Sequence, residues 1–151
     1  MKTLHIAGCG TDCIWQNDNL IAGRGKTRGG AAFYRNQCGF DIADGIYLLN
    51  HVQMDGGCIY LLDCHNVTII GNLFIFNKAK WGGAIYLERC TNTVISDNRF
   101  LFNFAVRDGG AISLSQCNDI IINGNFFAFN SALRSEGKID IHNCSKVKII
   151  P

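Results

Sequence analysis

The sequence has few side chains whose types and spacing could carry out a reaction. Glu88 and Asp140 are acids on the outward face of a repeated strand, two repeats apart, and His142 stands two residues beyond Asp140. Two carboxyl groups about 5–9.5 Å apart can hydrolyse a glycosidic bond, so these three residues are the candidate catalytic set. No further polar group obviously supports them, and the sequence therefore favours a protein that is not an enzyme.

Two tyrosines are the candidates for binding a sugar. Tyr60 and Tyr86 are one repeat apart, and on neighbouring strands their rings would form a small aromatic platform on which a sugar could stack. Tyrosine is also a common strand residue, because its ring packs well on a pleated surface. A purely structural role for both tyrosines therefore stays open beside ligand binding.

Basic residues recur at one loop position and are candidates for binding an anionic polymer. Lys80, Arg107 and Arg134 are about one repeat apart, so the fold would align them in a stripe. A positive stripe attracts polyanions, but Asp108 and Glu136 lie beside it in the sequence and offset its charge. Anion binding and a solvated loop face both remain as interpretations.

The eight cysteines indicate buried thiols rather than a cofactor site. Six fall into one column, and in-register stacking would set their Cβ atoms about one strand spacing, ~4.8 Å, apart. A disulfide needs Cβ atoms about 3.8 Å apart, and a metal needs ligands that converge on a point. Free thiols are therefore expected, with one or two disulfides or a metal as alternatives, and neither a metal nor a cofactor is predicted. The column contains Cys9, Cys38, Cys64, Cys90, Cys117 and Cys144.

A repeat with a period of 26 or 27 residues must position all of these side chains. Pairs of glycines end at Gly30, Gly57, Gly83 and Gly110, and Gly137 continues the series, with steps of 27, 26, 27 and 27 residues. A cysteine follows each of the last four glycines by seven residues. A fixed period of this size is typical of stacked supersecondary units.

One repeat, residues 82–108, predicts three short strands. Ile85 and Leu87 alternate with Tyr86 and Glu88, the pattern of a strand with one buried face. Two apolar segments follow at 93–95 and 100–102, separated by Asn- and Asp-rich turns. Three strands in a constant period predict an all-β fold, a right-handed parallel β-helix of about five and a half coils in one domain, residues 1–151. The expected coils are 1–28, 29–55, 56–81, 82–108, 109–135 and 136–151.

The same register predicts columns of identical residues inside the solenoid. Asparagine tolerates turn conformations and can bond to its equivalent in the next coil, so two asparagine ladders are expected beside isoleucine and phenylalanine columns. The columns are Ile59, Ile85, Ile112 and Ile139; Phe74, Phe100 and Phe127; Asn72, Asn98 and Asn125; and Asn77, Asn103 and Asn130.

The composition excludes some classes of partner. The chain is 48% hydrophobic and 17% charged, with a formal net charge of +2. This balance gives no strong attraction to nucleic acid. No apolar run approaches the ~20 residues that a transmembrane helix needs. Specific nucleic-acid binding and a membrane span are therefore not expected.

The repeat also resembles known β-helices. Gly-Gly-Ala-Ile at 82–85 and 109–112, with Phe-x-x-Asn at 74–77, 100–103 and 127–130, resembles the repeats of polymorphic outer-membrane protein passengers, which are bacterial surface adhesins. More broadly, the chain is similar to the pectate-lyase-like superfamily, which includes polysaccharide lyases, hydrolases and phage tailspikes. The resemblance implies the fold and not one function. The Asn-Thr-Asp and Gly-His-Gly motifs of polygalacturonases are absent.

These observations favour a non-catalytic structural or adhesive β-solenoid module of a surface or virion assembly. A carbohydrate-active enzyme that uses the outer face of the first strand is the second interpretation, and a scaffold that binds an anionic polymer through basic loops is the third. Open ends of a solenoid expose core side chains and strand edges. We therefore expect a homo-oligomer or a partner subunit to cover an end, with a polysaccharide as the ligand class. An extracellular, cell-surface or virion location is favoured.

Overall fold

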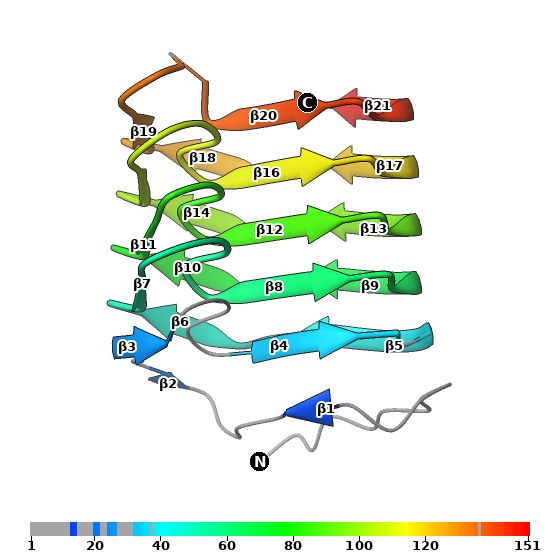
Figure 1. Ribbon diagram of the computed structural model, residues 1–151, viewed down its shortest axis with the longest axis horizontal. Coiled ribbons are helices and arrows are strands. Elements are labelled where there is room, and N and C mark those ends of the chain that lie inside the picture. Colours follow the sequence, from blue (N-terminus) through cyan, green and yellow to red (C-terminus); the bar gives the residue numbers. More distant parts are fainter. Residues whose placement is uncertain (1–12, 15–19, 22–23, 27–31, 37, 136) are drawn as a thin grey trace.

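The computed structural model describes residues 13–14, 20–21, 24–26, 32–36, 38–135 and 137–151. The chain winds repeatedly through four sheets, and corresponding strands of successive coils lie one above another, as β4, β8, β12, β16 and β20 do in Figure 1. The predicted parallel β-helix is therefore confirmed. The described residues contain no helix of the length and apolar character that a bilayer crossing requires.

We name the four sheets in the order in which each coil passes through them. The first sheet contains β1(Cys13–Ile14), β4(Ala32–Arg35), β8(Ile59–Leu62), β12(Ile85–Glu88), β16(Ile112–Ser115) and β20(Ile139–His142). The second contains β5(Cys38–Ala43), β9(His65–Ile70), β13(Thr91–Ser96), β17(Asn118–Asn123) and β21(Ser145–Ile150). The third contains β2(Leu20–Ile21), β6(Ile46–Leu48), β10(Leu73–Ile75), β14(Arg99–Leu101) and β18(Phe126–Ala128). The fourth contains β3(Arg24–Lys26), β7(His51–Val52), β11(Lys78–Ala79), β15(Phe104–Ala105) and β19(Ser131–Ala132).

Three details differ from the sequence prediction. Each coil has a fourth strand, of two residues in β7, β11, β15 and β19, where the sequence indicated only a loop. The described residues make about four turns, whereas five and a half coils were predicted for the whole chain. The strand β1 departs from the parallel arrangement, because it pairs antiparallel with β4, with Cys13 opposite Tyr34. The predicted first-coil cysteine Cys9 lies outside the described residues.

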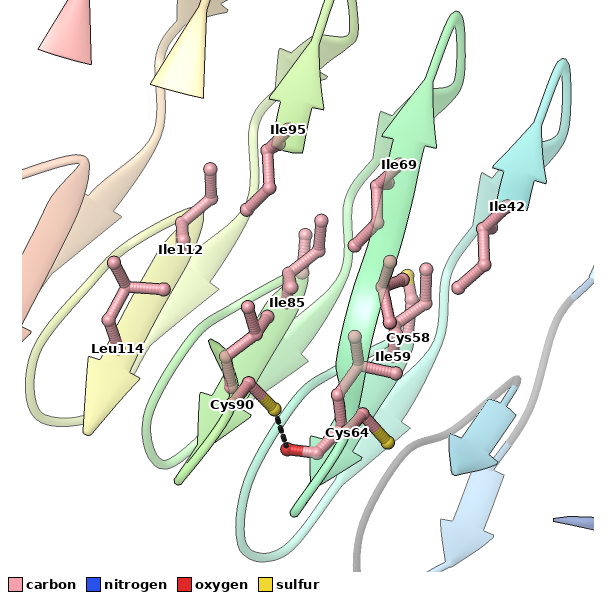
Figure 2. Close-up of a cluster of buried hydrophobic side chains, with 14 of the residues drawn as sticks. Ile42, Cys58, Ile59, Cys64, Ile69, Ile85, Cys90, Ile95, Ile112 and Leu114 are labelled. Atoms are coloured by element: carbon pink, nitrogen blue, oxygen red, sulfur yellow. Dashed lines mark hydrogen bonds between the residues drawn. The ribbon is translucent and has the colours of Figure 1, made fainter. Parts of the chain in front are cut away.

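The predicted register is confirmed residue by residue. Ile59, Ile85, Ile112 and Ile139 pair in one inward column, and the side chains between them point outward because successive strand residues face opposite sides. Figure 2 shows the inward isoleucines and cysteines of neighbouring coils packed in one continuous core. Burying one large aliphatic or aromatic side chain contributes roughly 1.5–3 kcal/mol, so every coil adds to the stability of its neighbours.

Aromatic rings stack through this core in the predicted phenylalanine column. The ring centroids of Phe74 and Phe100 are 4.8 Å apart, and those of Phe100 and Phe127 are 4.9 Å apart. Tyr47 continues the column at 4.9 Å from Phe74. The rings are nearly parallel, with interplanar angles of 6° to 10°, because identical rotamers repeat at the strand spacing.

The two predicted asparagine ladders are also present, and Asn50 extends one of them by a further coil. At Asn103, Nδ2 donates to the carbonyl of Phe74 at 3.0 Å and to Oδ1 of Asn130 at 2.9 Å. Its Oδ1 accepts from the main-chain N of Asn77 at 3.0 Å and from Nδ2 of Asn77 at 2.9 Å. Each fully buried amide is thus satisfied by the coils on both sides, which is the condition for burying a polar group without penalty.

Candidate functional site

A polar groove of about 350 Å³ lies on the outer face of the first sheet. Its floor comes from outward positions of β12, β16 and β20, and its wall comes from loop residues that precede each of those strands. The floor residues are Tyr86, Ser113, Ser115, Asp140 and His142, and the wall residues are Trp81, Asp108 and Arg134. The strand register fixes the floor, because Tyr86, Ser113 and Asp140 pair in one column and Ser115 pairs with His142 in the next.

Hydrogen bonds hold the floor of the groove. Ser113 Oγ donates to Oδ2 of Asp140 at 3.1 Å. Burial raises the pKa of Tyr86, whose side chain is hydrogen-bonded to that of Ser115, so its phenol is protonated at neutral pH. The groove therefore offers an aromatic ring, hydroxyl groups and carboxylate acceptors on a rigid sheet.

Cations pack against the aromatic wall. Lys80 Nζ lies 4.4 Å from the ring centroid of Trp81, and the Arg107 guanidinium carbon lies 5.2 Å from it. The main-chain N of Arg107 donates to the carbonyl of Lys80, and that of Arg134 donates to the carbonyl of Arg107. The predicted alignment of the three basic residues is thus confirmed. Two of them contact the indole ring, while Arg134 lines the groove.

The predicted tyrosine platform is only partly correct. The rings of Tyr60 and Tyr86 stack with centroids 5.3 Å apart, but Tyr60 is completely buried. Its hydroxyl donates to Oε2 of Glu88. Only Tyr86 therefore presents a ring to the groove, although both tyrosines occupy outward strand positions.

The two candidate carboxylates, Glu88 and Asp140, do not line the same groove. Asp140 and His142 line it, whereas Glu88 is absent from the lining and is held by other groups. Its Oε1 accepts from Nη1 of Arg89 at 2.7 Å, and Arg89 also contacts Asp63 at 2.8 Å. Asp108 is the second carboxylate of the groove. Asp108 directly precedes the glycine pair Gly109-Gly110. The repeat pattern predicted a loop at this position and no role in a site.

The cysteine column forms as a ladder, and four of its members are thiols outside disulfides. Cys64, Cys90 and Cys117 are buried and Cys144 is half-buried, and each Sγ lies 3.3 to 3.5 Å from a main-chain carbonyl. Figure 2 shows Cys64 and Cys90 in adjacent coils. Cys38, expected in the same column, is disulfide-bonded.

A family model described as "NosD: Periplasmic copper-binding protein (NosD)" matches residues 13–146. The chain belongs to the NosD family. No curated protein and no solved structure matches the chain significantly.

The donor atoms of this NosD-family chain do not fit a copper centre in its described part. Thiols are soft ligands that suit Cu(I), but the ladder places one per coil, buried and directed at main-chain carbonyls. In the part of the chain that the structure describes, no three His, Cys, Asp or Glu side chains form a group that could hold a metal ion. We therefore assign no chemical step to copper here.

The ladder gives a prediction for thiol chemistry. Burial raises the pKa of Cys58 well above its usual value of 9.0, so the reactive thiolate is scarce in the folded protein. We expect Cys58, Cys64, Cys90 and Cys117 to react with a thiol reagent only after unfolding in urea without reductant, because all four are buried. The raised folded-state pKa of Cys58 stabilises the fold below the unfolded pKa, so the contribution of this thiol to stability should fall as pH rises past about 9. Rapid labelling of these four thiols in the native protein would contradict the prediction.

Proposed function

We propose that this NosD-family chain is a non-catalytic, extracytoplasmic β-helix module that binds a saccharide in the groove on its first sheet. The observation that carries the proposal is the lining of that groove. Tyr86 and Trp81 supply aromatic surface beside the hydroxyls of Ser113 and Ser115 and the carboxylate of Asp140. Aromatic surface with a few placed polar groups is what a sugar ring, apolar on one face and polar at its edge, requires.

Two further observations support the location and the role. The family description names the periplasm, and the disulfide at Cys38 is of a kind that persists in oxidising compartments. The resemblance of the Gly-Gly-Ala-Ile repeats to adhesin passengers supports an adhesive module, in which the bound saccharide belongs to a surface.

The test is a screen of immobilised oligosaccharides followed by calorimetric titration of each hit. We expect Tyr86→Ala and Trp81→Ala each to weaken binding about ten-fold or more, since truncated aromatic anchors dominate binding energy. Ile121→Ala is the matched control, because Ile121 is exposed on β17 in a different sheet. Absence of any saccharide binding, or binding that survives Tyr86→Ala unchanged, would contradict the proposal.

A carbohydrate-active enzyme is the second candidate, because Asp108 and Asp140 line the same groove. Two carboxylates across a glycosidic bond can act as acid and base. If hydrolysis or elimination of a bound saccharide is detected, Asp140→Asn should abolish it while leaving binding measurable. Turnover that depends on Asp140 would replace the non-catalytic proposal.

A further inference from the structure

One corner of the solenoid carries bulky apolar residues in an unfavourable backbone conformation. Where the third sheet turns into the fourth, Leu49, Phe76, Phe102 and Phe129 have φ angles of 57°, 53°, 55° and 57°. The left-handed conformation costs an ordinary residue roughly 1–2 kcal/mol, and it is a genuine outlier for a bulky one. We call these four residues the apolar ridge.

Two of the other corners fill the same conformation with residues suited to it, whereas the turn from the first to the second sheet also holds Arg89 and Gln116 at positive φ. Where the second sheet turns into the third, the positive-φ residues are Asp44, Gly71, Asp97 and Gly124. Before the first sheet they are Gly56, Gly82 and Gly109. Aspartate and glycine adopt this conformation readily. None of the four described ridge positions holds aspartate or glycine. The strained conformation therefore recurs in four successive coils.

The ridge is exposed to solvent. The relative accessibilities are 46% for Leu49, 50% for Phe76, 43% for Phe102 and 75% for Phe129. The three phenylalanine rings stack with centroids 4.9 and 4.8 Å apart, and such stacking recovers about 0.5–1.5 kcal/mol per pair. It buries ring faces only, so the ring edges still form an apolar strip along the solenoid. Repeated exposed apolar residues of this kind mark an interaction surface.

The charges beside the ridge are positive. Exposed Arg99 lies on the third sheet, with its guanidinium carbon 5.7 Å from the ring centroid of Phe126, and exposed Lys78 lies on the fourth sheet, with Nζ 5.3 Å from the ring centroid of Phe104. Segments 46–52, 73–79, 99–105 and 126–132, which form the corner and both flanking strands, contain no Asp or Glu. In the sequence, the carboxylates closest to these segments are Asp44 and Asp97, at the turn before the third sheet, and Asp55 and Asp108, after the fourth.

We propose that the apolar ridge docks the protein on an anionic phospholipid surface. An apolar strip with flanking Lys and Arg inserts its apolar edge at the boundary between headgroups and acyl chains, while the cations meet lipid phosphates. The charge pattern favours an anionic phospholipid surface as the partner, because anionic headgroups complement Lys78 and Arg99. A corner that projects into solvent also needs no matching groove in a fluid bilayer. The ridge lies apart from the saccharide groove, so the two proposals are independent.

The experiment is co-sedimentation of the purified chain with phosphatidylcholine vesicles, with and without phosphatidylglycerol. We expect binding to the anionic vesicles that weakens as salt is added. The triple variant Phe76→Asn, Phe102→Asn and Phe129→Asn should bind at least ten-fold more weakly. Asparagine suits the left-handed conformation, so this variant should keep its thermal stability, and circular dichroism verifies that it is folded.

A charge-matched pair of double variants separates specific docking from general attraction. Lys78→Glu with Arg99→Glu changes residues beside the ridge, whereas Lys146→Glu with Lys148→Glu changes the net charge equally on β21. We expect only the first pair to abolish vesicle binding. Equal loss in both pairs, no binding by the original chain, or binding that survives the triple substitution would each overturn the proposal. Self-association that depends on the ridge, without vesicle binding, would instead identify a second copy as the occupant.

Discussion

Gly83→Ala is expected to be among the most damaging single substitutions in this protein. A Cβ atom at Gly83 would lie 2.1 Å from the carbonyl oxygen of Gly110 and 2.8 Å from main-chain atoms of Phe104. These are backbone atoms of Gly110 in the next coil and of Phe104 in β15 of the same coil. Ladder hydrogen bonds hold both segments in place, so no flexible side chain can move aside. We expect a loss of roughly 3 kcal/mol or more in the free energy of unfolding, at or above the upper end of overpacking effects.

Gly137 provides the matched control, because it occupies the equivalent repeat position in the last coil. A Cβ atom there would lie 3.0 Å from the carbonyl oxygen of Ile139, and its other nearest neighbours would be 3.8 Å away. Gly137→Ala should therefore change the free energy of unfolding by only about 1 kcal/mol. Urea titration followed by circular dichroism measures both variants. Equal midpoints for Gly83→Ala and the original chain would show that the coils can separate locally.

Asn103→Ala should have a comparably large effect for a different reason. The substitution removes the acceptor of the main-chain N–H of Asn77 and a donor to the carbonyl of Phe74, both inside the core. A buried polar group left without its partner costs about 1–3 kcal/mol, so the expected destabilisation is roughly 3–5 kcal/mol. Asn123→Ala is the control, since Asn123 is half-exposed at the end of β17, and it should change stability by about 0.5 kcal/mol or less.

Urea titration also measures the stabilities of Asn103→Ala and Asn123→Ala. Asn103→Asp keeps an acceptor oxygen but loses the amide donor and introduces a buried charge, so it should rescue little stability at pH 7. If Asn103→Ala proved as mild as Asn123→Ala, water would have to enter the ladder and replace the amide. That outcome would show that the ladder specifies register rather than stability.

The repeat made most of the fold predictable from the sequence. Columns such as Ile59 to Ile139 and Asn77 to Asn130 are readable because stacking requires the same residue type at the same phase in every coil. The fourth strand was missed because only two residues, such as Lys78 and Ala79, pair there, which is too short for a visible alternation. The antiparallel pairing of β1 was missed because its segment lacks the repeated residues.

The candidate site was less predictable because its residues do not repeat. Trp81 and Asp108 occupy equivalent loop positions with different chemistry, so no column draws attention to them. Tyr60 occupies an outward strand position and is nevertheless buried, which alternation alone cannot predict. The groove arises where loop and strand residues from several coils combine, and that combination depends on three-dimensional packing rather than on any local pattern.

The direction of the ladder hydrogen bonds has a mechanical consequence. In all four sheets the bonds join one coil to the next, so they lie along the axis on which the coils stack. Tension applied along that axis would load successive coil interfaces in series, and the weakest interface would open first. The molecule would then lengthen in steps, each releasing one coil of chain, and the remaining stack would keep its shape.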